Sequence, residues 1–442
     1  MKSITKLSST LLLAAVGLQL PLSAEQVKLD VAMAKPFLIA EKKQIAHMRV
    51  GLTGFELDSE EDRAPVNVSI VLDKSGSMAG QKIEHAKKAA IKAIDYLGSE
   101  DIVSIIAYDH TVSVLVPATK VSDKASIKQM ISKLSAGGNT ALFAGVSKGA
   151  AEIRKFIDKE RVNRVILLSD GRANSGPSSP KALGDLGASL NKEGISVTTW
   201  GLGNGYNEDL MVQLANKSDG NHTFIESPHQ LAGIFEAEFG DILSVVAQEV
   251  SIEIKCAAGI RPVKVLNREA EISGQKIFTQ MNQLYSSQEK YILLEVEVPA
   301  TGAGKSKKIA DVSISYANMM TETTDELSSS LSAKFTESKE IVQSNTNGKA
   351  MKDVVLCQAT AYNKMATKLR DEGKIEEAKQ VLIKNRDYLD LNATQLKSQQ
   401  LRGYWYANGK DLEAIEDDDK YQVRRKEMRS LQFKNDNSQI SY

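Results

Sequence analysis

The feature that most constrains the fold of this 442-residue chain is a regular alternation between residues 65 and 246. Short apolar stretches of strand length alternate with stretches that repeat apolar residues every three or four positions, which is the helical period. This order predicts an α/β fold with a mainly parallel sheet covered by helices on both faces. The short Asp109-His110 link between two apolar stretches predicts one antiparallel strand at an edge of the sheet.

The segments on either side of this α/β unit have a different period. Residues 25–64 and 247–325 contain stretches in which apolar and polar residues alternate, which indicates half-buried strands. We expect both segments to form one β-sandwich, with the α/β unit of residues 65–246 inserted into it, because chain termini that lie close together permit insertion. Two separate small β pieces are the alternative.

The C-terminal third of the chain changes period again. Ser328-Ser-Ser-Leu-Ser-Ala333 has the composition of a polar linker. Apolar residues at helical spacing on both sides of Gly373 predict a helical hairpin over residues 340–405. Residues 406–442 are rich in Lys, Arg, Asp and Asn and are expected to form a flexible tail.

The N-terminus has the pattern of a secretory signal peptide. Lys2 and Lys6 precede an apolar stretch that begins at Leu11, and small residues end at Ala24. We expect residues 1–24 to be a signal peptide that is cleaved after Ala24, with an uncleaved anchor as the alternative. No later segment is apolar over the roughly 20 residues that a membrane span needs, so the mature chain is predicted to lack a transmembrane helix.

Charge and cysteine content exclude some classes of protein. The chain has 56 basic and 56 acidic residues, whereas a nucleic-acid-binding protein normally shows a basic excess. Cys256 and Cys357 are its two cysteines. They could form one disulfide in an exported protein or remain as two buried thiols.

Hard oxygen ligands follow the ends of the predicted strands. Asp73, Ser75 and Ser77 follow the first strand of the α/β unit, Thr140 precedes a helix, and Asp170 follows a later strand. Open α/β sheets bind ligands at the carboxyl ends of their strands, so we expect these three loops to meet there. Two carboxylates and three hydroxyls suit a hard divalent cation, first of all Mg²⁺, with Mn²⁺ or Ca²⁺ as alternatives.

This arrangement resembles the metal-ion-dependent adhesion site of von Willebrand factor type A domains. The resemblance rests on Asp73-Lys-Ser-Gly-Ser77, on Thr140 in a GGNT loop and on Asp170 in an SDG loop, and it covers residues 65–246. It implies a Rossmann-like fold for this segment, with the metal at the top of the sheet. It also implies that Ser75, Ser77 and Thr140 coordinate the ion directly and that Asp73 and Asp170 act directly or through water. The flanking segments resemble secreted bacterial proteins of this type, which implies a location in the periplasm, at the cell envelope or outside the cell.

The resemblance implies a binding function rather than catalysis. We expect an exported adhesion or scaffold module whose ion coordinates an Asp or Glu side chain of a partner protein. The first alternative is a structural envelope protein in which the ion only stabilises loops and the β or helical region binds. A metal-dependent hydrolase or phosphatase is the weakest alternative, because Ser75 stands where a dehalogenase-type phosphatase has its second Asp, and no His lies in a triad-like context.

One further glycine-rich stretch imitates a nucleotide-binding loop. Gly201-Leu-Gly-Asn-Gly205 follows a predicted strand, but its third glycine has the wrong spacing and the strand comes late in the unit. We therefore interpret it as a turn beside the metal-binding edge of the sheet.

Overall fold

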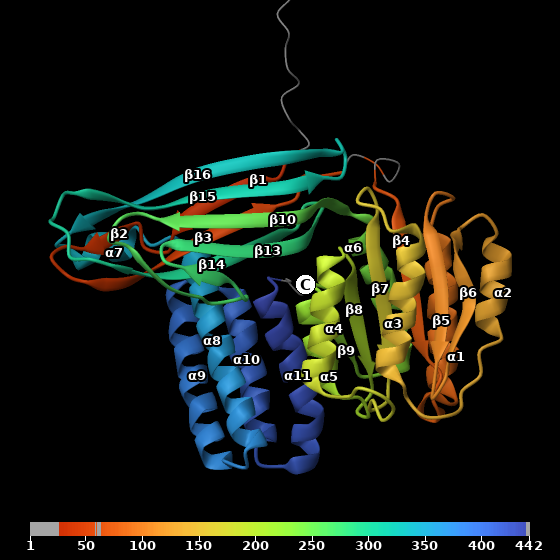
Figure 1. Cartoon of the computed structure of the whole chain (residues 1–442). Helices are drawn as coiled ribbons and strands as arrows, with labels where there is room; N and C mark the ends of the chain where they lie inside the picture. Colours follow the sequence, from red (N-terminus) through yellow and green to blue (C-terminus); the bar gives the residue numbers. More distant parts are fainter. Residues whose placement is uncertain (1–25, 58, 60–62, 439–442) are drawn as a thin grey trace, which may run out of the picture.

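The computed structural model describes residues 26–57, 59 and 63–438. The expected signal peptide, residues 1–24, lies outside the described residues. Three parts are visible in Figure 1: a β-sandwich, an α/β unit beside it and a helical bundle that lies below the sandwich and against the α/β unit. Among the described residues, no helix combines the length and apolar character that crossing a membrane requires.

The α/β unit contains a six-stranded sheet in the order β6-β5-β4-β7-β8-β9. Strand β6 is antiparallel to β5, and the other neighbouring strands are parallel. The predicted mainly parallel sheet with one antiparallel edge strand is thus confirmed. The strands are β4 (Val66–Asp73), β5 (Ile102–Tyr108), β6 (Val112–Lys120), β7 (Val162–Ser169), β8 (Ser196–Leu202) and β9 (His222–Ile225).

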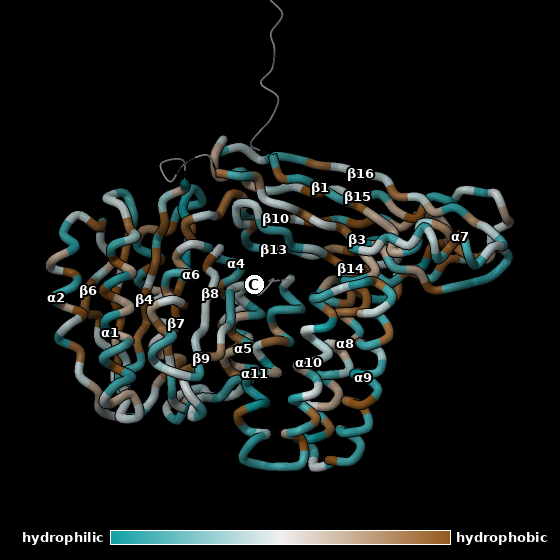
Figure 2. The backbone as a smooth tube through the Cα atoms, turned by 180° about the vertical axis from the view of Figure 1, so that it is seen from behind, coloured by the Kyte–Doolittle hydropathy of each residue, from teal (hydrophilic) through white to brown (hydrophobic). Residues whose placement is uncertain are grey.

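Helices cover both faces of this sheet because its central strands are apolar on both sides. Every residue of β4 is buried: Val68 and Ile70 pack with one layer of helices and Val71 with the other. The first layer consists of α1 (Gln81–Ala93), α2 (Lys124–Ser132) and α6 (Leu231–Leu243). The second consists of α3 (Leu142–Ile153), α4 (Pro180–Lys192) and α5 (Glu208–Lys217). Figure 2 shows the hydrophobic residues along these strands.

Strands from both flanks of the α/β unit share the two sheets of the sandwich. One sheet has the order β1-β3-β14-β11 and the other β12-β13-β10-β15-β16-β2. The N-terminal strands are β1 (Lys28–Met33), β2 (Phe37–Ile39) and β3 (Gln44–Thr53). The later ones are β10 (Val245–Cys256), β11 (Arg261–Val265), β12 (Glu271–Ser273), β13 (Lys276–Tyr285), β14 (Glu289–Val298), β15 (Ser306–Asn318) and β16 (Thr323–Thr336).

The structure corrects the prediction of a linker at residues 328–333. These residues belong to β16, which pairs with β15 from Thr323 to Lys334. Ser328, Ser330 and Ser332 lie on the exposed face of the strand, whereas Ala333 and Phe335 are buried. A serine-rich strand with one solvated face has the composition of a linker, and this explains the error.

The C-terminal region contains more helix than the sequence predicted. After α7 (Lys339–Ser344), the predicted hairpin is present as α8 (Gly348–Asp371) and α9 (Ile375–Gln395), joined at Gly373 with a φ of 79°. Residues 406–442, expected to be a flexible tail, instead contain most of α10 (Gln399–Ala414) and all of α11 (Asp418–Asp436). The buried face of α11 includes Lys426, Gln432 and Asn435, so it lacks a continuous apolar stripe.

The bundle contacts both other parts of the molecule. Cys357 of α8 packs with Tyr291 of β14, and Arg49 of β3 donates to Asp353 of α8 over 2.6 Å. Helix α11 packs along α5 and β9 of the α/β unit. Cys256 and Cys357 are both buried free thiols.

Candidate metal site

The first loop of the site is held by the carboxylate of Asp73 at the end of β4. Its Oδ1 accepts a hydrogen bond from the backbone N–H of Ser75 over 2.8 Å. Its Oδ2 accepts one from the hydroxyl of Ser169 over 2.7 Å, at the end of the neighbouring strand β7. Asp73 therefore both shapes its own turn and ties two strand ends together.

Ser77 connects the first loop to the third. Its Oγ lies 3.1 Å from Ser75 Oγ and donates to Asp170 Oδ1 over 2.6 Å. Asp170 directly follows β7, which is parallel to and paired with β4. The parallel pairing explains why two residues 93 positions apart lie within hydrogen-bond distance.

The loop that carries Thr140 completes the arrangement. The backbone N–H of Gly76 donates to Gly138 over 2.9 Å, which joins this loop to the first. A Cβ built on Gly171 would lie 2.8 Å from Thr140 Oγ1 and 3.4 Å from Ser77 Oγ. The hydroxyls of Thr140 and Ser77 therefore both lie against the loop that follows β7. All three predicted loops meet at the carboxyl edge of the sheet.

Three residues of this edge were missed by sequence reasoning. Ser169 binds Asp73, Asn174 accepts from the backbone N–H of Thr140 over 2.9 Å, and Lys82 forms an ion pair with Asp170 Oδ2. Ser169 and Asn174 flank the recognised Asp170, and Lys82 lies in the first turn of the helix that follows Ser77. Their nearness to the signature residues is a signal, but their contacts depend on the folded loops.

Four of the five site residues are buried, whereas Ser77 is exposed. The side chain of Asp170 is 0% exposed, and Asp73, Ser75 and Thr140 are also buried. Burial raises the pKa of Asp73, and the charge of Asp170 acts in the same direction, although hydrogen bonds from Ser75 and Ser169 oppose it. Two carboxylates that share a buried edge favour a positively charged group beside them.

The donor set fits a hard divalent cation rather than a soft one. The converging side chains offer hydroxyl and carboxylate oxygens, which suit Mg²⁺, Mn²⁺ or Ca²⁺. Within the part of the chain that the structure describes, no group of three or more His, Cys, Asp or Glu residues could hold a metal. The candidate site is of another kind, because three of its five side chains are hydroxyls and only two are carboxylates.

A fourth loop supports Asp170 from behind. A Cβ on Gly205 would lie 2.6 Å from the backbone oxygen of Asp170, so the loop after β8 approaches it as closely as only glycine permits. The ring of Tyr206 in this loop packs against Gly201 near the end of β8. The glycine-rich stretch is therefore a close-packed turn at this edge.

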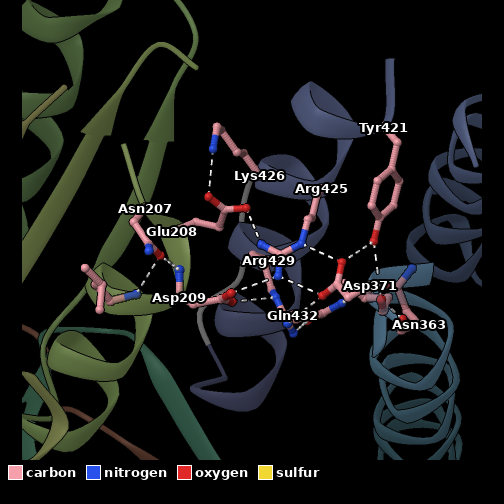
Figure 3. Close-up of polar contacts among 12 residues, drawn as sticks. Asn207, Glu208, Asp209, Asn363, Asp371, Tyr421, Arg425, Lys426, Arg429 and Gln432 are labelled. Carbon is pink, nitrogen blue, oxygen red and sulfur yellow. Dashed lines mark hydrogen bonds and ion pairs between the residues drawn. The ribbon is translucent and has the colours of Figure 1, made fainter. Parts of the chain in front are cut away.

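Helix α11 contacts the end of this loop and the first turn of α5, and Figure 3 shows the contacts with α5. Lys426 Nζ donates to the backbone oxygen of Tyr206 over 3.0 Å and to Glu208 Oε2 over 2.7 Å. Arg425 pairs with Glu208, and with Asp209 and Asp371 over 2.8 Å each. Glu208 and Asp209 form the first turn of α5, where acidic side chains also favour the helix dipole.

The fold and the site define the class of protein. It is an α/β domain with a site of hydroxyl and carboxylate oxygens at the carboxyl edge of its sheet. Residues 67–237 match the model of the von Willebrand factor type A domain. The chain therefore contains a von Willebrand factor type A domain, flanked by a β-sandwich and a helical bundle.

Solved structures share the fold well beyond this domain. A von Willebrand factor type A protein from Catenulispora acidiphila superposes with a TM-score of 0.70 at 18% identity, covering 85% of this chain and 89% of that one. The ArnB paralog VWA2 from Sulfolobus acidocaldarius gives a TM-score of 0.64 at 19% identity, covering 94% and 100%. At these identities the likeness concerns the fold.

Sequence relatives come from bacteria and eukaryotes. An uncharacterized protein of Synechocystis is 29% identical over 62% of this chain and 67% of its own length. YfbK of Escherichia coli is 27% identical over 52% of this chain, but the match spans 41% of YfbK. Human inter-alpha-trypsin inhibitor heavy chain H3 is 27% identical over 42% of this chain and 22% of its own length.

Proposed function

We propose that this chain is a metal-dependent protein-binding module in which Asp73, Ser75, Ser77, Thr140 and Asp170 hold Mg²⁺ and the ion captures a partner's Asp or Glu side chain. The observation that carries the proposal is the 2.6 Å contact between Ser77 Oγ and Asp170 Oδ1, which brings two of the three oxygen-bearing loops to one point. The von Willebrand factor type A domain supports it, because such domains commonly mediate protein interactions.

The chain's own residues have distinct tasks in this proposal. Ser75, Ser77 and Thr140 supply neutral oxygens, and Asp73 and Asp170 supply negative charge while remaining hydrogen-bonded to the protein. A bound divalent ion would supply concentrated positive charge and a coordination position for an external carboxylate. The proposed role is binding without turnover.

The proposed setting is the bacterial envelope or the space outside it. Support comes from the basic and apolar pattern of residues 1–24 and from bacterial relatives in Synechocystis and Escherichia coli. Export would place the site where it can meet proteins of the periplasm or cell surface.

Metal titration tests the proposal directly. Mn²⁺ binding to the full chain is followed by electron paramagnetic resonance, and capture of a carboxylate is followed through the relaxation of acetate methyl protons by the bound Mn²⁺. Asp73→Ala and Thr140→Ala should each weaken Mn²⁺ binding at least about tenfold. Ser132→Ala, which removes an exposed hydroxyl at the end of α2, should have no effect. A wild-type chain that binds no Mn²⁺ would refute the proposal.

A structural role for the ion is the second candidate. It is favoured by the burial of Asp73, Thr140 and Asp170, because an ion held by buried side chains could join the three loops without contacting a partner. In that case chelation lowers the melting temperature of the protein. The relaxation rate of the acetate methyl protons then stays at the value expected for acetate that does not contact the bound Mn²⁺. Acetate relaxation above that level favours the binding role.

A further inference from the structure

Lys82 supplies a cation to the candidate metal site. It lies in the first turn of α1, and its Nζ pairs with Asp170 Oδ2 while Ser77 donates to Asp170 Oδ1. The side chain of Asp170 is 0% exposed and that of Lys82 is 32% exposed. Both oxygens of Asp170 thus already have partners from the protein itself.

Of the basic residues next to the site, Lys74 is used elsewhere and Arg172 is exposed to solvent. Lys74, directly after Asp73, pairs with Asp109. Within the described part of the chain, Asp170 forms an ion pair with Lys82, and Asp73 forms none. Nζ of Lys82 is also near the fourth loop, because a Cβ on Gly203 would lie 3.9 Å from it. The loop partly shields this ion pair from water, so salt screens it less than a surface pair.

The charge of Lys82 decides the net charge of the loaded site. Asp73, Asp170 and Lys82 together carry a formal charge of −1. A divalent ion would change this to +1, whereas the same site without the lysine would become neutral. A site with residual positive charge attracts an external carboxylate, and a neutral one does so weakly.

We propose that Lys82 tunes the site toward its partner: it weakens binding of the divalent ion and strengthens capture of an acidic side chain by the bound ion. The inference rests on the proposed metal-binding function. The physical reason is that Lys82 repels the ion and draws charge density from Asp170, while its positive charge adds to the attraction felt by an incoming carboxylate. Lys82 therefore sets the ligand preference of the site through its charge.

Two neutral variants test this inference. Lys82→Met removes the charge and keeps the length of the side chain, and Lys82→Gln removes the charge but retains a hydrogen-bond donor for Asp170. In both, Mn²⁺ should bind tighter by about tenfold or more, because one unit positive charge near a dication is lost. Acetate should bind the loaded site more weakly, and Lys82→Arg, which keeps the charge, should resemble the wild type.

Lys87→Met is the matched control. Lys87 lies on the same helix and pairs with Glu84 over 2.8 Å, away from the site carboxylates. It should leave both affinities unchanged. Thermal melting of each variant identifies any loss of fold. If Lys82→Met does not fold, Lys82→Gln still tests the inference.

The outcomes separate the two proposals. If the wild type binds Mn²⁺ and Asp73→Ala does not, but both neutral Lys82 variants bind Mn²⁺ and acetate as the wild type does, the role of Lys82 is overturned and the metal site stands. Weaker Mn²⁺ binding in both variants would also overturn it, because Lys82 would then support the ion rather than oppose it. Failure of the wild type to bind Mn²⁺ would instead overturn the metal site.

Discussion

Single residues at the carboxyl edge of the sheet show which parts of the site a sequence can reveal. Asp73 ends β4, Asp170 follows β7 and Thr140 lies shortly before α3, so the alternation of strands and helices placed them at one edge. Lys82, Ser169 and Asn174 could not be assigned this way, because Lys, Ser and Asn are common on any loop or helix surface. Their roles depend on contacts between loops up to 96 residues apart.

Gly205 gives the sharpest residue-scale prediction. Gly205→Ala would place a Cβ 2.6 Å from the backbone oxygen of Asp170, and the loop would have to move. We expect a loss of about 1–3 kcal/mol in the free energy of unfolding and weaker Mn²⁺ binding, measured by urea denaturation and titration. Gly233→Ala, in α6 with no atom within 4 Å of the added Cβ, should be neutral or slightly stabilising. Equal effects of the two variants would contradict this explanation.

His222 predicts how stability depends on pH. Burial lowers its pKa to about 3, and the charge of Lys434 acts in the same direction. The folded state thus favours neutral His222, so its stabilising contribution is complete above the ordinary pKa of 6.5 and is lost as the pH falls toward 3. Each unit of pH in that window costs up to about 1.4 kcal/mol. Asp241, whose pKa burial raises to about 6, acts oppositely in the acidic range.

A variant isolates the contribution of His222 from that of other groups. His222→Asn retains a polar atom near Thr199, whose Oγ1 lies 2.9 Å from His222 Nδ1. The difference in unfolding free energy between wild type and variant should shrink steadily from pH 7 to pH 4 in urea titrations. A constant difference would show that His222 does not titrate in this window.

At the scale of elements, the period of apolar residues predicted the strands and helices of the α/β unit but not the end of the bundle. Helix α11 is held to α5 by Arg425, Lys426 and Arg429 on one side and by Glu208 and Asp209 on the other. Hydrophobic periodicity is the main signal by which a helix is predicted from sequence. A helix that packs through ion pairs lacks this signal and is therefore predicted as a solvated tail. Strand β16 was missed for a related reason, since its outer face is serine-rich.

Arg425 carries the element-scale prediction. Its side chain is 13% exposed and pairs with Glu208, Asp209 and Asp371. Arg425→Met would leave three acids close together without this cation, and we expect a loss of about 3 kcal/mol in the free energy of unfolding. Lys181→Met, which breaks an exposed pair on α4 with the lysine 84% exposed, should cost less than about 0.5 kcal/mol. Guanidinium denaturation compares the two, and similar losses would contradict a structural role for the Arg425 network.

At the scale of the whole molecule, the bundle is a bridge between the sandwich and the metal edge. Asp353 of α8 binds Arg49 of the sandwich, and Lys426 of α11 binds the backbone of Tyr206 in the loop behind Asp170. Helix α11 thus contacts the loop that lies against Asp170. The sequence order of the parts could not show this contact, because it joins residues 220 positions apart.

Lys426→Met tests that connection from outside the site. The change removes the hydrogen bonds to Tyr206 and Glu208, so the loop after β8 should support Asp170 less firmly. We expect Mn²⁺ affinity to fall about twofold to tenfold, within the usual range of coupling between distant sites, although Lys426 contributes no ligand. Lys379→Met, which breaks an exposed ion pair with Glu416 elsewhere in the bundle, should leave Mn²⁺ affinity unchanged. If Lys426→Met lowers the melting temperature but not the affinity, α11 stabilises the fold without influencing the site.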